Sequence, residues 1–276
     1  SGRQNMRNLN TGKENTWCVG CGNFGILAAI KKSITALNED NIPLADIVIT
    51  CGIGCHGKIF DYLNLSGIYG LHGRAIATAQ GIKLANPKLK VISFGGDGDS
   101  LGEGLEHTLF AAKRNIDLTL ILHNNGNYGL TTGQASPLSY MGYKGLSTPM
   151  GNVETPFNPI TLLIEAGATF VARGYSARID HLSTLIQKAV QHKGFSFIEV
   201  LQPCVSYNNN YDLYNDRCSL LENTPQDEEQ ARHLAKATEQ IYLGVFKQEL
   251  KPEYCESIKL QDNPQSRSER MAQILR

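Results

Sequence analysis

The sequence predicts an α/β fold in which a mostly parallel sheet carries helices on both faces. Two apolar runs, residues 91–94 and 118–122, have the length and composition of short buried strands. The amphipathic segment between them suits a helix that crosses from one parallel strand to the next. Segments with helix and strand patterns also alternate along the chain, and this alternation is typical of a parallel sheet covered on both sides.

The first half of the chain begins with an arm and a tight loop. Residues 1–16 are polar and are expected to be extended, and residues 17–21 form the loop. A helix is expected over 23–37 because apolar residues recur there every three or four positions. A strand, a glycine-rich loop and a helix that ends before Pro87 follow at 46–50, 51–58 and 75–84.

The second half repeats the alternation and then loses its clear pattern. A loop rich in Gly and Thr opens an irregular stretch that continues to residue 158. Helices and strands then alternate at 160–166, 169–172, 179–192 and 196–201, and a further helix is expected at 228–248. We therefore expect an N-terminal arm (1–16), an α/β domain (17–204) and a C-terminal arm (205–276) that packs on the domain or on a partner.

Composition excludes several classes of protein. The 276 residues include 26 Lys+Arg and 26 Asp+Glu, and this balance argues against nucleic-acid binding. No apolar run approaches the roughly 18 residues of a membrane span. The polar N-terminus lacks the apolar core of a secretory signal, so a cytoplasmic protein is expected. Seven cysteines in such a chain favour metal or redox chemistry over disulfides.

Polar side chains follow both central strands. Asp97 comes after the first strand and Asn125 after the second. Ligands of open α/β sheets bind at the carboxyl ends of the strands, where the two side chains would meet. A carboxylate, an amide oxygen and a backbone carbonyl can hold Mg²⁺, which keeps other positions for phosphate oxygens. This spacing resembles the thiamine diphosphate motif, GDG followed by NN, which implies Asp97, Asn125 and the carbonyl of Asn127 as magnesium ligands.

Four cysteines can meet at the same edge of the sheet. Cys18 and Cys21 form a C-x-x-C pair, Cys55 lies in the loop after the first strand, and Cys204 follows the last strand. Four thiolates can hold a [4Fe–4S] cluster or a structural Zn²⁺, and the residues alone leave both readings open.

The possible magnesium ligands and the four cysteines both lie within a series of short motifs. The motifs are Trp17-Cys18-Val19-Gly20-Cys21-Gly22, Gly52-Ile53-Gly54-Cys55, His72-Gly73-Arg74, Gly96-Asp97-Gly98-Asp99, Asn124-Asn125-Gly126-Asn127-Tyr128-Gly129-Leu130-Thr131 and Gln202-Pro203-Cys204. In this order they resemble the β subunit of 2-oxoacid:ferredoxin oxidoreductases. The resemblance implies a thiamine diphosphate-binding fold, thiamine diphosphate, Mg²⁺, and one [4Fe–4S] cluster held by Cys18, Cys21, Cys55 and Cys204.

The resemblance also implies an activity and a set of cofactor contacts. The activity is the coenzyme A-dependent oxidative decarboxylation of a 2-oxoacid, with electrons passed through the cluster to ferredoxin. The expected contacts to thiamine diphosphate come from the loops at the strand ends. They are Ile53, Gly54, Cys55, His56, His72, Gly98, Asp99, Gly129, Leu130 and Thr131.

Three residues are candidates for catalysis and substrate choice. His72 could polarise the substrate carbonyl or contact the diphosphate, or it could only bond the backbone at a helix start. Lys58 could pair with a second substrate carboxylate, which favours 2-oxoglutarate and the product succinyl-CoA. The alternatives are a solvated lysine and a preference for pyruvate or for a broad range of 2-oxoacids. Leu130 is expected to line the same pocket and limit its size.

The family draws the glutamate that activates thiamine diphosphate from a separate α subunit, and no segment here resembles that subunit. We therefore expect an active site at a subunit interface, an (αβ)₂ assembly, and no activity in the isolated chain. Two rival interpretations remain. One is half of a non-oxidative thiamine diphosphate decarboxylase with structural zinc, and the other is a non-catalytic metal-binding scaffold.

Overall fold

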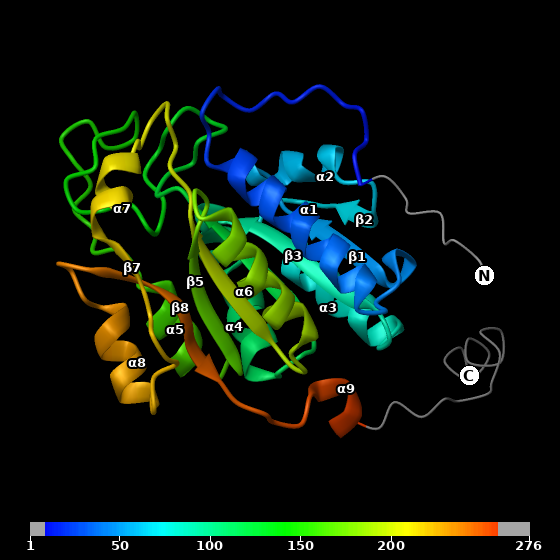
Figure 1. Ribbon diagram of the computed structural model, residues 1–276. Coiled ribbons are helices and arrows are strands. Elements are labelled where there is room, and N and C mark those ends of the chain that lie inside the picture. The colour runs from blue at the N-terminus through cyan, green and yellow to red at the C-terminus, as the bar shows by residue number, and fades with distance from the viewer. Residues whose placement is uncertain (1–8, 259–276) are drawn as a thin grey trace, which may run out of the picture.

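One eight-stranded sheet organises the molecule. The computed structural model describes residues 9–258, and its strands follow the order β2-β1-β3-β4-β6-β5-β8-β7 (Figure 1). The strands from β2 to β5 are parallel to their neighbours, whereas β8 is antiparallel to β5. The mostly parallel sheet is therefore confirmed. The strands are β1 (Ile47–Cys51), β2 (Ser66–Tyr69), β3 (Lys90–Gly96), β4 (Thr119–Asn124), β5 (Phe170–Tyr175), β6 (Ser196–Leu201), β7 (Cys218–Leu220) and β8 (Ile241–Gln248).

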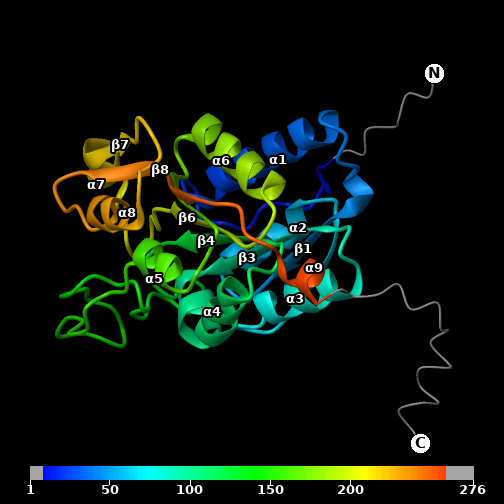
Figure 2. The same ribbon diagram turned by 90° about the horizontal axis from the view of Figure 1, so that it is seen from below.

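Helices cover both faces of the sheet, as predicted (Figure 2). On one face lie α1 (Asn23–Glu39) and α6 (Ile179–Gln191). On the other face lie α3 (Ala75–Ala85), α4 (Leu105–Lys113) and α5 (Pro159–Glu165). Shorter helices and helical turns connect these elements. They are η1 (Leu44–Asp46), η2 (His56–Lys58), α2 (Ile59–Tyr62), η3 (Asp99–Glu103), α7 (Tyr211–Arg217), α8 (Glu228–Ala235) and α9 (Tyr254–Ser257).

The central strands form because their side chains are buried on both faces. In β4, Ile121 packs among the residues of α1 and α6, while Leu120 and Leu122 pack among those of α3, α4 and α5. This alternation is the period of two expected of a strand. Full burial of each such side chain contributes about 1.5–3 kcal/mol to folding.

The prediction of one helix over residues 228–248 is wrong beyond Ala235. The chain forms α8 and then β8, which pairs antiparallel with β5 and parallel with β7. The second part of this segment is rich in β-branched and aromatic residues, which favour a strand. The sheet therefore extends past Cys204. The rest of the expected C-terminal arm, residues 259–276, lies outside the described residues, as do residues 1–8 of the N-terminal arm.

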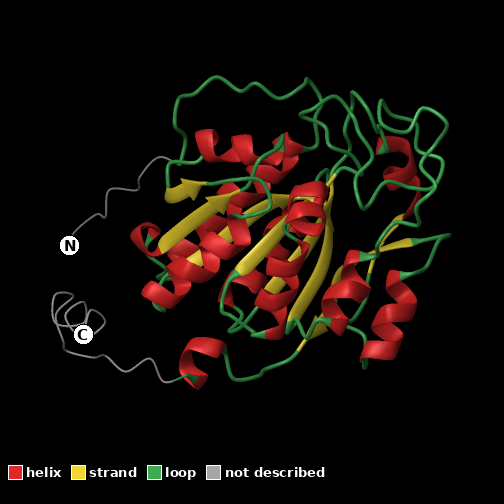
Figure 3. Ribbon diagram, turned by 180° about the vertical axis from the view of Figure 1, so that it is seen from behind, coloured by secondary structure: helices red, strands yellow, loops and turns green. Residues whose placement is uncertain are grey.

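The long loops gather at one edge of the sheet (Figure 3). The expected N-terminal arm is partly described there. The backbone of this arm forms hydrogen bonds with α2 and with the residues that follow it. Leu9 O accepts from Asn64 N at 3.0 Å, and Thr16 N donates to Tyr62 Oη at 2.9 Å. No helix within residues 9–258 combines the length and the apolar character that crossing a membrane requires.

Candidate active site

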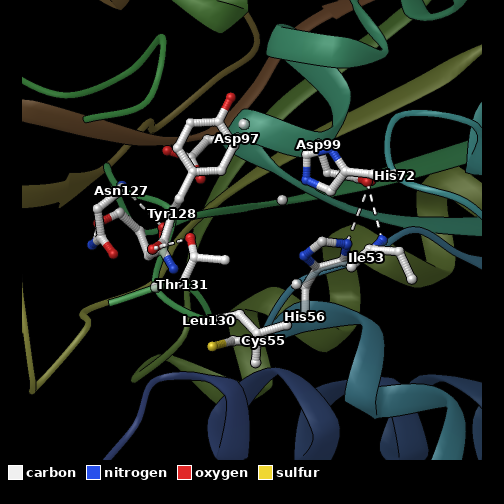
Figure 4. Close-up of a pocket in the computed structure, with 15 residues that line it drawn as sticks. Ile53, Cys55, His56, His72, Asp97, Asp99, Asn127, Tyr128, Leu130 and Thr131 are labelled. Carbon is white, nitrogen blue, oxygen red and sulfur yellow. Dashed lines mark hydrogen bonds and ion pairs between the residues drawn. The ribbon is translucent and has the colours of Figure 1, made fainter. Parts of the chain in front are cut away.

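A pocket, here called the central pocket, opens at the ends of β1, β3 and β4 (Figure 4). It brings together all ten residues predicted to contact the cofactor and all three predicted magnesium ligands. Their individual roles remain predictions. The lining residues are Ile53, Gly54, Cys55, His56, His72, Gly96, Asp97, Gly98, Asp99, Asn125, Asn127, Tyr128, Gly129, Leu130 and Thr131.

The oxygens expected to bind magnesium suit a hard cation. Asp97 is buried and accepts a hydrogen bond from Ser136 Oγ. Burial raises the pKa of Asp97 to about 6, although the Ser136 hydrogen bond opposes the rise. A cation beside this carboxylate would compensate for its lost hydration. Asn125 Oδ1 accepts from Asn127 N at 3.1 Å, and the buried Asn127 Oδ1 has no hydrogen-bond partner in the described part of the chain.

The Asp99 carboxylate connects the start of η3 to the loop after β1 and to the loop after β2. Its Oδ1 accepts from Ile53 N at 3.1 Å and from Gly73 N at 2.8 Å. Its Oδ2 lies 3.4 Å from His56 Nε2, and Figure 4 shows His56 and Ile53 converging on this carboxylate. Burial raises the pKa of Asp99, but His56 and the backbone hydrogen bond outweigh it and hold the pKa below its ordinary value. A Cβ on Gly52 would stand 2.0 Å from Asp99 Oδ2, so glycine is required there.

Two residues of the site were not identified from the sequence. Tyr128 Oη donates to the Glu103 carboxylate at 3.2 Å, and Glu103 Oε2 also lies 3.1 Å from His72 Nδ1. The Tyr128 ring covers Gly98, where an added Cβ would stand 2.2 Å from Tyr128 Cε1. His72, which lines the pocket, thus pairs with the carboxylate of the neighbouring Glu103. Tyr128 lies within the Asn-Asn motif, which was the available signal, whereas nothing in the sequence marks Glu103.

A second pocket, here called the cysteine pocket, contains all four predicted cluster ligands. Lys58 also lines this pocket and not the central one, and its Nζ donates to Thr16 O at 3.3 Å. Cys55 precedes the helical turn η2, so Cys55 and Lys58 are three residues apart on the same side of that turn. The lining residues are Thr16, Trp17, Cys18, Cys21, Cys55, Lys58, Asn125, Gly129, Gln202, Cys204, Val205, Ser206 and Tyr207.

The thiols of the cysteine pocket affect one another's pKa values. Burial raises the pKa of Cys21 to about 11, and Cys204, Cys55 and Cys18 each add to the rise. Burial also raises the pKa of Cys55, although Lys58 opposes it. A bound metal would replace the thiol protons. Within residues 9–258, no three His, Cys, Asp or Glu side chains converge as the ligands of a single metal ion.

Close backbone packing brings the C-x-x-C pair to the end of β6. Cys21 N donates to Cys18 O at 3.0 Å, which closes the turn. Gly22 N then donates to Pro203 O at 3.2 Å, and a Cβ on Gly22 would stand 2.9 Å from Gln202 Cγ. The absence of a side chain at Gly22 therefore allows this turn to lie directly on the segment that carries Cys204.

The two pockets share a wall. Cys55, Asn125 and Gly129 line both of them. Trp17 Nε1 donates to Cys55 O at 2.6 Å, which ties the N-terminal loop to the same wall. A group in one pocket would therefore lie beside a group in the other.

Two family models match the chain. The thiamine pyrophosphate enzyme C-terminal TPP-binding domain matches residues 52–200, which include the central pocket. The C-terminal part of the pyruvate ferredoxin oxidoreductase beta subunit matches residues 204–262.

Similar proteins carry consistent names. The chain is 47% identical over 246 residues to 2-oxoacid:ferredoxin oxidoreductase 1, subunit beta, from Aeropyrum pernix, covering 83% of this chain and 76% of that protein. It is 39% identical to 2-oxoglutarate synthase subunit KorB from Archaeoglobus fulgidus, covering 88% of each chain. A solved structure of 2-oxoglutarate:ferredoxin oxidoreductase from Magnetococcus marinus superposes with a TM-score of 0.87 at 28% identity, covering 99% of this chain and 98% of that one.

The strand-end motifs, the thiamine diphosphate-type pocket and these matches agree. The chain belongs to the family of 2-oxoacid:ferredoxin oxidoreductase β subunits, thiamine diphosphate-dependent enzymes in which it acts with a partner subunit.

Proposed function

We propose that this subunit, together with an α subunit, converts 2-oxoglutarate and coenzyme A to succinyl-CoA and CO₂ and passes the electrons through a [4Fe–4S] cluster to ferredoxin. The reaction could also run in the reductive direction. The main support is the wall shared by the two pockets, formed by Cys55, Asn125 and Gly129. A cluster behind that wall would lie next to the site of decarboxylation.

The central pocket suits thiamine diphosphate and Mg²⁺. Asp97, Asn125 and the Asn127 carbonyl would hold the cation, and the amides of Gly98 and Asp99 would face the diphosphate. Bound there, the cofactor supplies an electron sink for the loss of CO₂.

The remaining wall residues would position the reactants. The loop that contains Ile53, Gly54 and His56 is held in place by contacts with Asp99. These residues would therefore present a fixed surface to the cofactor ring. His72, oriented by Glu103, would face the substrate carbonyl or the diphosphate. Gly129, Leu130 and Thr131 also line this pocket, and we propose that the Leu130 side chain limits the length of the substrate.

The cysteine pocket provides the ligands for the proposed cluster. Cys18, Cys21, Cys55 and Cys204 all line this one pocket. Four thiolates can hold a [4Fe–4S] cluster. The ferredoxin in the relatives' names also supports an electron-transfer group at this place.

Substrate choice has two candidates. Relatives named for 2-oxoglutarate and the solved structure with 2-oxoglutarate bound support that acid. Relatives of 47% and 51% identity are named only for 2-oxoacids, which supports broad specificity as the second candidate. For Lys58 to bind a second substrate carboxylate, its ammonium must move from Thr16 O toward the central pocket.

The α subunit would complete the active site. The described residues that line the central pocket include no glutamate, and the neighbouring Glu103 is paired with Tyr128 and His72. We propose that the activating glutamate comes from the partner and that the subunits assemble as (αβ)₂.

Anaerobic co-expression with the α subunit tests the proposal. The complex should contain iron, show broad visible absorption, and reduce a dye with coenzyme A and 2-oxoglutarate at a higher kcat/KM than with other 2-oxoacids. The isolated β chain should be inactive. Cys18→Ser should lose iron, whereas Cys218→Ser, outside both pockets, should keep it. A colourless zinc protein contradicts the proposal, and equal kcat/KM values for all the acids would support broad specificity instead.

A further inference from the structure

Side chains next to Cys204 donate hydrogen bonds to both sulfurs of the C-x-x-C pair. Gln202 Nε2 lies 3.5 Å from Cys21 Sγ, and Ser206 Oγ lies 3.3 Å from Cys18 Sγ. One short segment at the end of β6 thus contributes the proposed cluster ligand Cys204. It also contributes hydrogen-bond donors to two further proposed ligands, Cys21 and Cys18.

The orientation of the Gln202 amide follows from its second partner. The same Nε2 donates to Pro203 O at 2.9 Å, and a carbonyl oxygen can only accept a hydrogen bond. The amide nitrogen, and not the oxygen, must therefore face Pro203 and Cys21.

The buried amide also leaves its other end unpaired. Gln202 is only 2% exposed, and its Oε1 has no hydrogen-bond partner among residues 9–258. Such an unpaired buried oxygen costs stability, so its presence calls for an explanation. A role for the N–H group at the Cys21 sulfur provides one.

We propose that Gln202, and to a smaller extent Ser206, raise the reduction potential of the cluster, an inference that rests on the proposed [4Fe–4S] site. Reduction adds negative charge to the cluster and its thiolates. A hydrogen-bond donor stabilises the more negative state more strongly, so it favours reduction. In this role both are positioning residues that act on the cluster through their hydrogen bonds to its ligands.

Burial distinguishes the two donors. Gln202 is buried, so water cannot replace its N–H group when the amide is removed. Ser206 is exposed, so water can hydrogen-bond Cys18 in its place. The inference therefore predicts a larger change in potential at Gln202 than at Ser206.

The test is a redox titration of the anaerobic αβ complex, followed by EPR of the reduced cluster. Gln202→Met keeps the side-chain length but removes the donor. We expect about a tenfold lower ratio of reduced to oxidised cluster at a fixed potential, equivalent to about 59 mV for one electron. Ser206→Ala should shift the potential less, Ser206→Thr should retain the wild-type value, and Gln191→Met, on α6 outside both pockets, should change nothing.

The outcomes separate this inference from the proposed function. A Gln202→Met complex with full iron content and an unchanged potential overturns the inference alone. If that variant loses its cluster, pulsed EPR of the wild-type complex labelled with ¹⁵N in glutamine side chains decides. A ¹⁵N coupling to the reduced cluster supports the hydrogen bond, and its absence overturns it. A wild-type complex without iron overturns the proposed function and this inference with it.

Discussion

Gly129 and Cys55 lie next to each other in the wall between the two pockets. A Cβ built on Gly129 would stand 3.5 Å from Cys55 Sγ. The same carbon would stand 3.2 Å from Asn127 Oδ1 and 3.4 Å from Asn125 Nδ2. One glycine thus lies between a sulfur of the proposed cluster site and the side chains of two residues of the proposed magnesium site.

Gly129→Ala should disturb both sites at once. The added methyl group would press on the neighbouring amides, so we expect the Kd for thiamine diphosphate to rise about tenfold, a loss of about 1.4 kcal/mol. Contact with Cys55 should also change the EPR spectrum of the reduced cluster. Calorimetric titration and EPR on the same preparation check this. A variant with wild-type affinity and an unaltered spectrum would show that the shared wall does not couple the sites.

Gly98→Ala should weaken cofactor binding for a different reason. The new Cβ would collide with the Tyr128 ring, which must then move into the central pocket or away from Glu103. We expect at least about a tenfold rise in the Kd for thiamine diphosphate, measured by calorimetry.

Gly81→Ala is the matched control. Gly81 lies inside α3, and a Cβ there would meet no atom of the other described residues within 4 Å. This substitution should leave the Kd unchanged and raise stability by about 0.4–1 kcal/mol, because alanine restricts the unfolded chain. If Gly98→Ala binds thiamine diphosphate as tightly as Gly81→Ala does, close packing at Gly98 has no part in cofactor binding.

The central strands and their loops could be predicted because burial on both faces leaves continuous apolar runs. Ligand-binding residues then follow each strand and collect at one edge. The outer strands left weaker signals. The short edge strand β2 was not predicted, and β8 falls within the segment 228–248 where a helix is expected from the sequence.

Contacts between distant residues could not be derived in the same way. Glu103 meets Tyr128 from 25 positions away, after a turn whose shape the sequence does not reveal. The side of the loop on which Lys58 lies also depends on the geometry of η2. Residue positions were thus predictable, but the orientations of these side chains required the folded chain.

Lys58→Ala tests whether this lysine selects the substrate. If Lys58 binds the second carboxylate of 2-oxoglutarate, the KM for that acid should rise about tenfold or more, because a charge-assisted hydrogen bond is lost. The KM for pyruvate, which lacks this carboxylate, should change little. Steady-state assays of the αβ complex with both acids provide the comparison.

Lys32→Ala is the control for Lys58→Ala. Lys32 pairs with Asp180 on the exposed surface of α1 and α6. Its removal should leave both KM values unchanged. Equal changes in the two KM values of the Lys58 variant would remove Lys58 from substrate selection and leave only its place in the cysteine pocket.

The stability of the fold should fall in mild acid, in part through His192. This side chain is buried, and its Nε2 lies 2.8 Å from Thr169 Oγ1. Burial lowers its pKa from 6.5, and Lys90 adds to the effect, although Asp117 and Glu249 oppose it. Above pH 6.5 the imidazole is largely neutral in both states. As the pH falls through that value, the unfolded chain binds the proton more readily, so folding stability is lost.

His192→Gln should reduce this pH dependence. The amide can still hydrogen-bond Thr169 but does not titrate. The wild-type free energy of unfolding should decline more steeply than that of the variant between about pH 7 and pH 5.5, by at most about 1.4 kcal/mol per pH unit. Urea unfolding at several pH values measures both slopes. Parallel slopes would mean that His192 takes up its proton equally readily in the folded and unfolded chains, contrary to the effect of its burial.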